Sequence, residues 1–300
     1  MRVTNKMIAQ TVLNNLAANL NRLQKLQDQM SSLHVVSKTS DDPMIATRVV
    51  TLNSVLKQHD QYEQNISDAK NWIETTESTL GNVTDALQRA REQAVYGANG
   101  TLDQTSREAI AQEIDNIFDN IVQLANTNFA GRYIFGGTKT TTKPFESDGE
   151  YKGNEGKEGE LKWEISQKVE MIVNIDGKKV FGDTSAAGDN GIFTVLNNLR
   201  AHLRSGDTQA VSNTDLGELD RVINGILNLR ASLGAKANRL ETATSQSGGE
   251  RTNYEALLSK LNDVDLAKVV TDFSMQENVY QAALSTGARI ILPSLVNFLT

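Results

Sequence analysis

The sequence predicts a mainly α-helical, elongated protein of long helices and coiled-coil ends, whose discontinuous domains carry a small β-rich insertion. Apolar residues recur at helical spacing at both ends of the 300-residue chain. Glycine is absent before Gly81, whereas 11 of the 21 glycines lie between Gly131 and Gly191, so helix-compatible arms flank a turn-rich middle. Only three prolines occur, and aromatic residues make up 5% of the chain, which suits thin helical seams better than one thick core.

Both ends of the chain carry a narrow apolar stripe. The residues of the N-terminal stripe, which only Gln27 interrupts, are Leu13, Leu16, Leu20, Leu23 and Met30. Those of the C-terminal stripe are Val270, Phe273, Tyr280, Leu284, Ile291, Leu295 and Phe298. Spacings of three and four residues place side chains along one side of a helix, and such a stripe is stable only against another helix. We therefore expect an assembly interface here, in which the ends pack on each other, on neighbouring copies, or on both.

A second, very long helix is predicted to begin at Pro43. The first arm should end at about Ser37, and the polar joint that follows closes with Asp41, Asp42 and Pro43. Asp42 can cap the new helix, and Pro43 suits its first position because its missing N–H costs nothing there. Apolar residues then recur in steps of seven and are broken only by His59, which predicts a helix roughly 80 Å long.

A third helix should fold back on the second. Thr105, followed three residues later by Glu108, is typical of a capping box at a helix start. Apolar residues from Ile110 to Leu124 then share one face. We expect the two helices to form an antiparallel hairpin with a common seam.

The turn-rich middle is predicted to contain β structure. A short strand is expected near residues 132–137. Apolar and polar residues alternate between 168 and 175, and Asp176–Gly177 follows. Because Asp-Gly favours tight hairpin turns, a β-hairpin is predicted over 168–182.

Helical periodicity returns after the insertion, over 192–203 and more strongly over 219–240. Gly248–Gly249 is either a tolerated weak point or a true break, and residues 263–265 are the expected joint before the last arm. This order of helices implies a nested organisation.

Three discontinuous domains are expected from that nesting. The first is a terminal coiled-coil domain of residues 1–40 and 265–300. The second is a bundle of long helices from 41–139 and 191–264. Residues 140–190 form the third, a small β-rich outer domain.

Several classes of function are disfavoured by composition. The net charge of −7 argues against nucleic acid or an anionic membrane as a partner, and no run of 18 apolar residues or secretory signal is present. Cysteine is absent, and the three histidines have none of the usual metal spacings. No G-x-S-x-G elbow or other catalytic set occurs. We therefore expect no enzyme activity, no cofactor and no metal site.

The joint and the helix after it carry a family resemblance. The segments 40–43, 65–69, 90–95 and 98–101 together resemble the N-terminal conserved region of bacterial flagellins, and the last arm resembles their C-terminal region. Pro43 and the segment 128–138, with Pro144–Phe145 after it, are more similar to the hook-associated protein 3 branch of that family. Many relatives have a glycine after the first arm where this chain has residues 32–37.

The resemblance implies a structural subunit of the bacterial flagellum at the hook–filament junction. In that family the paired ends form the inner layer of a tube, and Asp41, Asp42 and Pro43 lie at the joint between domains. Expected partners are hook-associated protein 1, flagellin, neighbouring copies in a ring, and an export chaperone that covers the C-terminal stripe. Export through the flagellar type III channel, without a cleaved signal, would place the chain in the extracellular flagellum.

Three alternatives remain open at the level of sequence. A minor flagellin would form the filament itself. A coiled-coil adaptor or signalling module would be a stable dimer with ordered ends. An enzyme is the weakest alternative, because nothing supplies a nucleophile with its base.

Overall fold

The computed structural model describes residues 5–185 and 190–291, and the chain divides into two compact units. The terminal unit comprises residues 1–58 and 249–300, and the central unit comprises residues 59–248. The two longest helices, α2 (Pro43–Gly97) and α7 (Leu216–Asn262), contribute to both.

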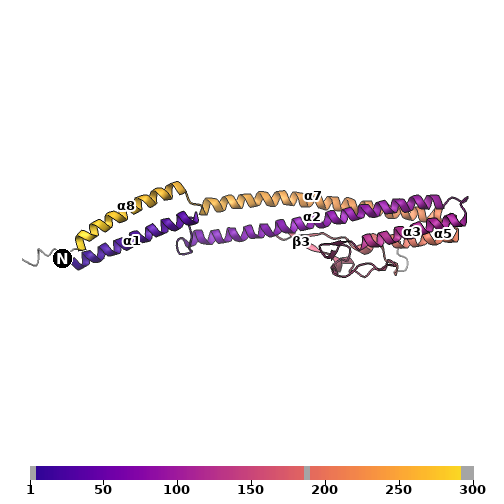
Figure 1. Ribbon diagram of the computed structural model, residues 1–300, viewed down its shortest axis with the longest axis horizontal. Helices are drawn as coiled ribbons and strands as arrows, with labels where there is room; N and C mark the ends of the chain where they lie inside the picture. Colours follow the sequence, from indigo (N-terminus) through magenta and orange to yellow (C-terminus); the bar gives the residue numbers. More distant parts are fainter. Residues whose placement is uncertain (1–4, 186–189, 292–300) are drawn as a thin grey trace, which may run out of the picture. The chain divides into compact units, whose positions relative to one another are not determined.

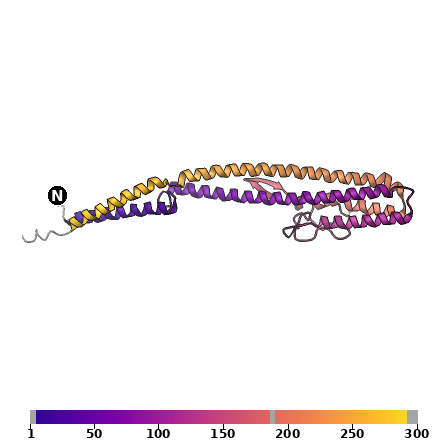
Figure 2. The same ribbon diagram turned by 45° about the horizontal axis from the view of Figure 1, so that its top comes forward.

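In the terminal unit, α1 (Asn5–Ser32) and α8 (Leu266–Ile291) run side by side in antiparallel directions (Figures 1 and 2). Their contact is close, since a Cβ added at Gly287 would lie 2.9 Å from Val12 Cγ1. Asn19 Oδ1 also accepts a hydrogen bond of 3.3 Å from Gln276 Nε2. The expected pairing of the two ends is therefore present within a single chain.

α1 ends five residues earlier than the sequence predicts. Leu33 adopts a positive φ of 62° directly after Ser32, which stops a helix because left-handed backbone cannot continue it. The chain then pairs with the segment after α7, where Val35 N donates to Asn262 O at 2.7 Å and Val264 N donates to Leu33 O at 3.1 Å. The two chain reversals are thus joined by backbone hydrogen bonds.

α2 begins at Pro43 as predicted. Asp42 Oδ1 accepts hydrogen bonds from the backbone N–H groups of Met44 at 2.9 Å and Ile45 at 3.0 Å, so it caps the helix. Asp41 has a different role, because its Oδ2 accepts from Lys38 N at 3.1 Å and closes the turn before the cap.

The central unit is built from α2, α3 (Gln104–Ala125), α5 (Ile192–Ser205) and α7. α3 lies beside α2 (Figures 1 and 2). Its apolar stripe, with Ile114 and Ile121 fully buried, joins the same core as Leu80 and Leu87 of α2. The expected common seam of α2 and α3 is confirmed, but the N-terminal cap expected for α3 is not. Asp103 Oδ1 accepts from Ser106 N at 3.0 Å and caps α3, so the capping box expected at Thr105 was wrong.

Two short segments precede α7, and α7 itself is unbroken. They are α6 (Thr208–Ala210) and the π-helical turn η2 (Val211–Asp215). Gly248–Gly249 lies inside the continuous helix, so it is a tolerated weak point. The joint predicted at residues 263–265 is confirmed, since α7 ends at Asn262 and α8 begins at Leu266.

The insertion carries two small antiparallel sheets and two short helices. One sheet pairs β1 (Asn128–Phe129) with β2 (Arg132–Tyr133), and the other pairs β3 (Lys162–Ser166) with β4 (Val169–Ile172). The helices are the 3-10 turn η1 (Gly156–Gly159) and α4 (Gly177–Phe181). The fold class expected from sequence, mainly helical with a small β-containing insertion, is confirmed.

The predicted hairpin over 168–182 was wrong in its turn and in one strand. The observed turn lies at residues 167–168, where Lys168 has a φ of 61°. Asp176 instead starts a helix, because its Oδ1 accepts from Lys178 N at 3.1 Å. An aspartate that precedes glycine serves a helix cap as well as a tight turn.

The insertion shares its core with the helices around it. The rings of Phe145 and Phe181, from the insertion, lie 5.4 and 5.8 Å from that of Phe193 in α5. Phe193 in turn lies 5.2 Å from Phe118 of α3. Trp163 of β3 packs edge-on against the buried Trp72 of α2. These contacts hold the insertion within the central unit. The division into three domains stays a prediction.

Candidate assembly interface

The predicted stripe residues fall into two groups on the paired ends. Leu16, Leu23, Met30, Phe273 and Tyr280 are half-buried. Four others, Leu13, Leu20, Val270 and Leu284, keep 40–52% of their surface exposed. Ile291 is the last described residue of α8, and Leu295 and Phe298 lie outside the described residues.

The seam between α1 and α8 is formed by a heptad series that differs from the predicted one. On α1 this series is Val12, Leu16, Asn19, Leu23, Leu26 and Met30, all of which are half-buried. On α8 the series is Val269, Phe273, Gln276, Tyr280, Ala283 and Gly287, of which Val269 and Gly287 are buried and the others half-buried. Both series step by three and four residues, as expected for a coiled coil. The predicted series missed the small and polar members because they carry no apolar signal, and it missed Val12, Leu26 and Val269 because it ran through the residue after each of them.

The four exposed apolar residues lie on one flank of this pair. Leu13 and Leu20 each follow a seam residue of α1, and Val270 and Leu284 each follow a seam residue of α8. In an antiparallel coiled coil, the residues that directly follow Val12 and Asn19 on α1 lie on the same side as those that directly follow Val269 and Ala283 on α8. We call Leu13, Leu20, Val270 and Leu284 the apolar flank.

The opposite flank is mainly polar. Its described positions are Ile8, Asn15, Arg22, Gln29, Asp265, Asp272, Val279 and Thr286. Two of these eight are apolar, whereas the flank with Leu13 and Leu284 adds only Gln27 and Glu277 to its four apolar residues. The two sides of the paired ends therefore differ in chemistry, as expected if one side is covered in an assembly.

The paired ends bury little of their own surface. None of the residues 7–32 of α1 is buried, and Val269 and Gly287 are the buried positions among residues 266–289 of α8. By contrast, eight of the 22 residues of α3 are buried. Complete burial of an aliphatic side chain stabilises by about 1.5–3 kcal/mol, so covering the half-exposed apolar flank would contribute about 1 kcal/mol per residue.

Charges at the joint are exposed and their pairing is weak. Lys38 Nζ lies 3.2 Å from Asp28 Oδ2, and Lys25 Nζ lies 4.0 Å from Asp41 Oδ1. Exposed pairs of this kind typically contribute less than about 1 kcal/mol. The backbone pairing and the Asp42 cap, rather than ion pairs, define this joint.

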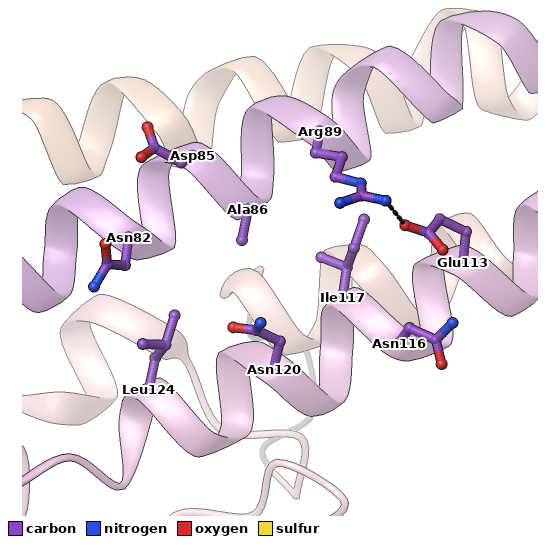
Figure 3. Close-up of a pocket in the computed structure, with 9 residues that line it drawn as sticks. All are labelled: Asn82, Asp85, Ala86, Arg89, Glu113, Asn116, Ile117, Asn120 and Leu124. Carbon is purple, nitrogen blue, oxygen red and sulfur yellow. Dashed lines mark ion pairs between the residues drawn. The ribbon is translucent and has the colours of Figure 1, made fainter.

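A polar groove of about 540 Å³ lies between α2 and α3 in the central unit. Figure 3 shows Asn82 and Ala86 of α2 facing Ile117, Asn120 and Leu124 of α3. The Arg89–Glu113 ion pair, with 2.6 Å between Nη2 and Oε1, spans one end. The residues that line the groove provide carboxamides and charged groups, but no nucleophile with a base beside it.

Residues 5–185 and 190–291 show neither a metal-binding cluster nor a membrane-spanning helix. Within them, no three histidine, cysteine, aspartate or glutamate side chains gather where a metal ion could bind. No helix in the same ranges is both long and apolar enough to cross a membrane.

Known proteins similar to this chain are flagellar. Residues 3–140 match the bacterial flagellin N-terminal helical region, and residues 216–299 match the bacterial flagellin C-terminal helical region. The chain is 31% identical to the flagellar hook-associated protein 3 of Escherichia coli strain K12, over 94% of this chain and 95% of that protein. It is 27% identical to a flagellin of Bacillus subtilis strain 168, over 94% of each chain.

A solved structure supports the same relationship. The crystal structure of Bacillus cereus FlgL matches with a TM-score of 0.59 at 27% identity, and the match covers 70% of this chain and 99% of that one. The two regions that match flagellin, residues 3–140 and 216–299, contain the long helices α2 and α7. Matches to both helical regions of flagellin, together with the 31% identity to a hook-associated protein 3, assign this chain to the bacterial flagellin family.

Proposed function

We propose that this chain is a structural subunit of the bacterial flagellum that joins the hook to the filament, and that neighbouring copies cover its apolar flank. The observation that carries the proposal is the exposure of Leu13, Leu20, Val270 and Leu284 together on one flank of the paired ends, while the opposite flank is mainly polar. The name of the hook-associated protein 3 relative supports the location in the flagellum.

The ends gain their order from assembly in this proposal. An isolated pair of helices that buries few side chains has little to offset the entropy of ordering it. Covering the apolar flank with neighbouring copies supplies the missing burial. A chain whose ends are loosely held before assembly also suits export through a narrow channel.

The junction role implies specific partners and a specific location. The partners are hook-associated protein 1 on one side, flagellin on the other, and further copies in a ring. An export chaperone covers the α8 stripe before secretion, because an amphipathic helix offers one apolar face to a groove. The chain acts in the extracellular flagellum, reaches it through the flagellar export channel, and catalyses no reaction.

The decisive experiment replaces two residues of the apolar flank. The double variant Leu20→Asp with Leu284→Asp should be exported by a strain that lacks its own junction protein, yet fail to enter flagella or restore motility. Its matched control is Asn15→Asp with Thr286→Asp, which adds the same two charges to the exposed opposite flank. Restored motility in the Leu20–Leu284 variant would refute the proposed interface.

A second experiment tests ordering on assembly. Limited proteolysis and circular dichroism of the free protein should find residues 1–40 and 265–300 digested first, with the helical central unit retained. Protease-resistant ends in the free monomer would contradict this step, while leaving the junction role open to the motility test.

The similarity to a flagellin supports a second candidate function, a subunit of the filament itself. A filament-forming flagellin should polymerise alone into long fibres, whereas a junction subunit should stop at short assemblies. An adaptor module would instead form a stable dimer with ordered ends. Electron microscopy of the purified protein and its mass in solution separate these three outcomes.

A further inference from the structure

α7 has a long internal stretch in which no side chain is buried. Leu240 and Asn262 are both buried, and every residue of α7 between them is at least partly exposed. Burial of side chains supplies most of the stability of a helix in a folded protein. Burial therefore stabilises this stretch less than it stabilises residues 219–240 of the same helix.

α2 has the same feature beside it. No residue of α2 between Leu52 and Ile66 is buried. A hydrogen bond of 3.4 Å between His59 Nδ1 and Ser247 Oγ links the two stretches. A polar contact thus lies where the apolar seam is interrupted on both helices.

Gly248 and Gly249 lie within this stretch of α7. A Cβ added at either position would meet no atom within 4 Å, so close packing does not require glycine there. Neither residue has a positive φ. Each glycine inside a helix lowers the helix equilibrium constant about fivefold relative to alanine. The pair therefore lowers the helix propensity of α7 at a place where neither steric space nor a positive φ requires glycine.

The surrounding sequence reinforces the effect. Residues 244–252 of α7 contain no apolar side chain, and adjacent glycine and serine residues are frequent sites of helix kinks.

We infer that α7 has a built-in bending point at Gly248–Gly249, where its backbone hydrogen bonds open locally while the helix on either side stays formed. Local opening is easiest where tertiary burial and helix propensity are both low, and both are low here. A few backbone torsions can then absorb a bend without repacking a core. The inference concerns the free chain and does not depend on the junction role.

Hydrogen exchange of the full-length protein tests the bending point. In the wild-type chain, amides of residues 245–252 should exchange at least about tenfold faster than those of 219–240. The variant Gly248→Ala with Gly249→Ala should slow exchange over 245–252 by about twentyfold, because two alanines restore the helix propensity. Circular dichroism checks that the helix content is retained.

The matched control is Gly225→Ala with Gly234→Ala. These glycines lie in the same helix, and an added Cβ at either would also meet no atom within 4 Å, but buried residues such as Ile226 and Leu233 surround them. This control should leave exchange over 245–252 unchanged. Equal protection of 245–252 and 219–240 in the wild type, or equal slowing by both double variants, would overturn the inference.

Discussion

Replacing Phe145 by alanine tests whether the insertion and the helices share one folding unit. Phe145 is fully buried, and its ring lies 5.0 Å from that of Tyr151, 5.3 Å from that of Phe181 and 5.4 Å from that of Phe193. Its backbone is also tied to the end of α3, because Phe145 N donates to Asn126 Oδ1 at 3.0 Å. The ring of Phe145 therefore contacts α4 and α5, and its backbone contacts the end of α3.

The expected loss of stability is large. A buried phenylalanine changed to alanine typically costs about 3–5 kcal/mol, from lost burial and the cavity left behind. With a urea dependence of about 2–3 kcal/mol per molar, the unfolding midpoint of the central unit should fall by about 1–2 M. Circular dichroism follows the helices, and the fluorescence of Trp72 and Trp163 follows the contact between α2 and β3. Both signals should shift together.

A surface aromatic residue of the same unit provides the control. Tyr96 is 58% exposed, so Tyr96→Ala should change stability by less than about 0.5 kcal/mol. The reasoning would be refuted if Phe145→Ala loosened the insertion while the helical transition kept its midpoint. That result would instead favour the independent outer domain expected from the sequence.

Three further substitutions test separate features. Asp103→Ala should lower the urea midpoint of the central unit and Thr105→Ala should not, because Asp103 accepts the hydrogen bond that caps α3; equal effects would contradict this. Gly287→Val should make α1 and α8 more sensitive to limited proteolysis, because a Cβ there would lie 2.9 Å from Val12 Cγ1; unchanged digestion would rule out so close an approach. Lys236→Met should raise the midpoint at neutral pH, because burial lowers the pKa of the Lys236 amine below its usual 10.5 and so disfavours its charged form in the folded chain. The penalty is present at low pH and vanishes above pH 10.5, where the amine is neutral in both states, so the advantage of methionine should shrink as the pH rises.

Features with strong local chemistry were predictable from the sequence. Asp42 followed by Pro43 left one good place for α2 to begin, and the cap is present at 2.9 and 3.0 Å. The long apolar periodicity of α2 and α3 gave their common seam, because that repeat fits no other regular structure. The joint before α8 was also found, since residues 263–265 interrupt the helical pattern on both sides.

Features that depend on tertiary contact were missed. Asp176–Gly177 fits both a hairpin turn and a helix start, and only the packing of Val180 and Phe181 into the core favours the helix. The observed turn at Lys168 uses a positive φ without glycine, which no turn signal marks. α1 likewise stops at Ser32 because the backbone after it pairs with residues more than 200 positions away.

The distribution of side chains over the paired ends is itself evidence for neighbours. If α1 and α8 were stabilised by each other alone, every seam position would favour a large apolar residue, whose complete burial stabilises by about 1.5–3 kcal/mol. Instead, seam positions are given to Asn19, Gln276 and Gly287, while Leu13 and Leu284 stand exposed beside it. The small and polar seam residues let the helices approach closely but hold them weakly. Since Leu13, Leu20, Val270 and Leu284 stay exposed beside the seam, where neighbouring copies can cover them, the stability of these ends should depend strongly on assembly.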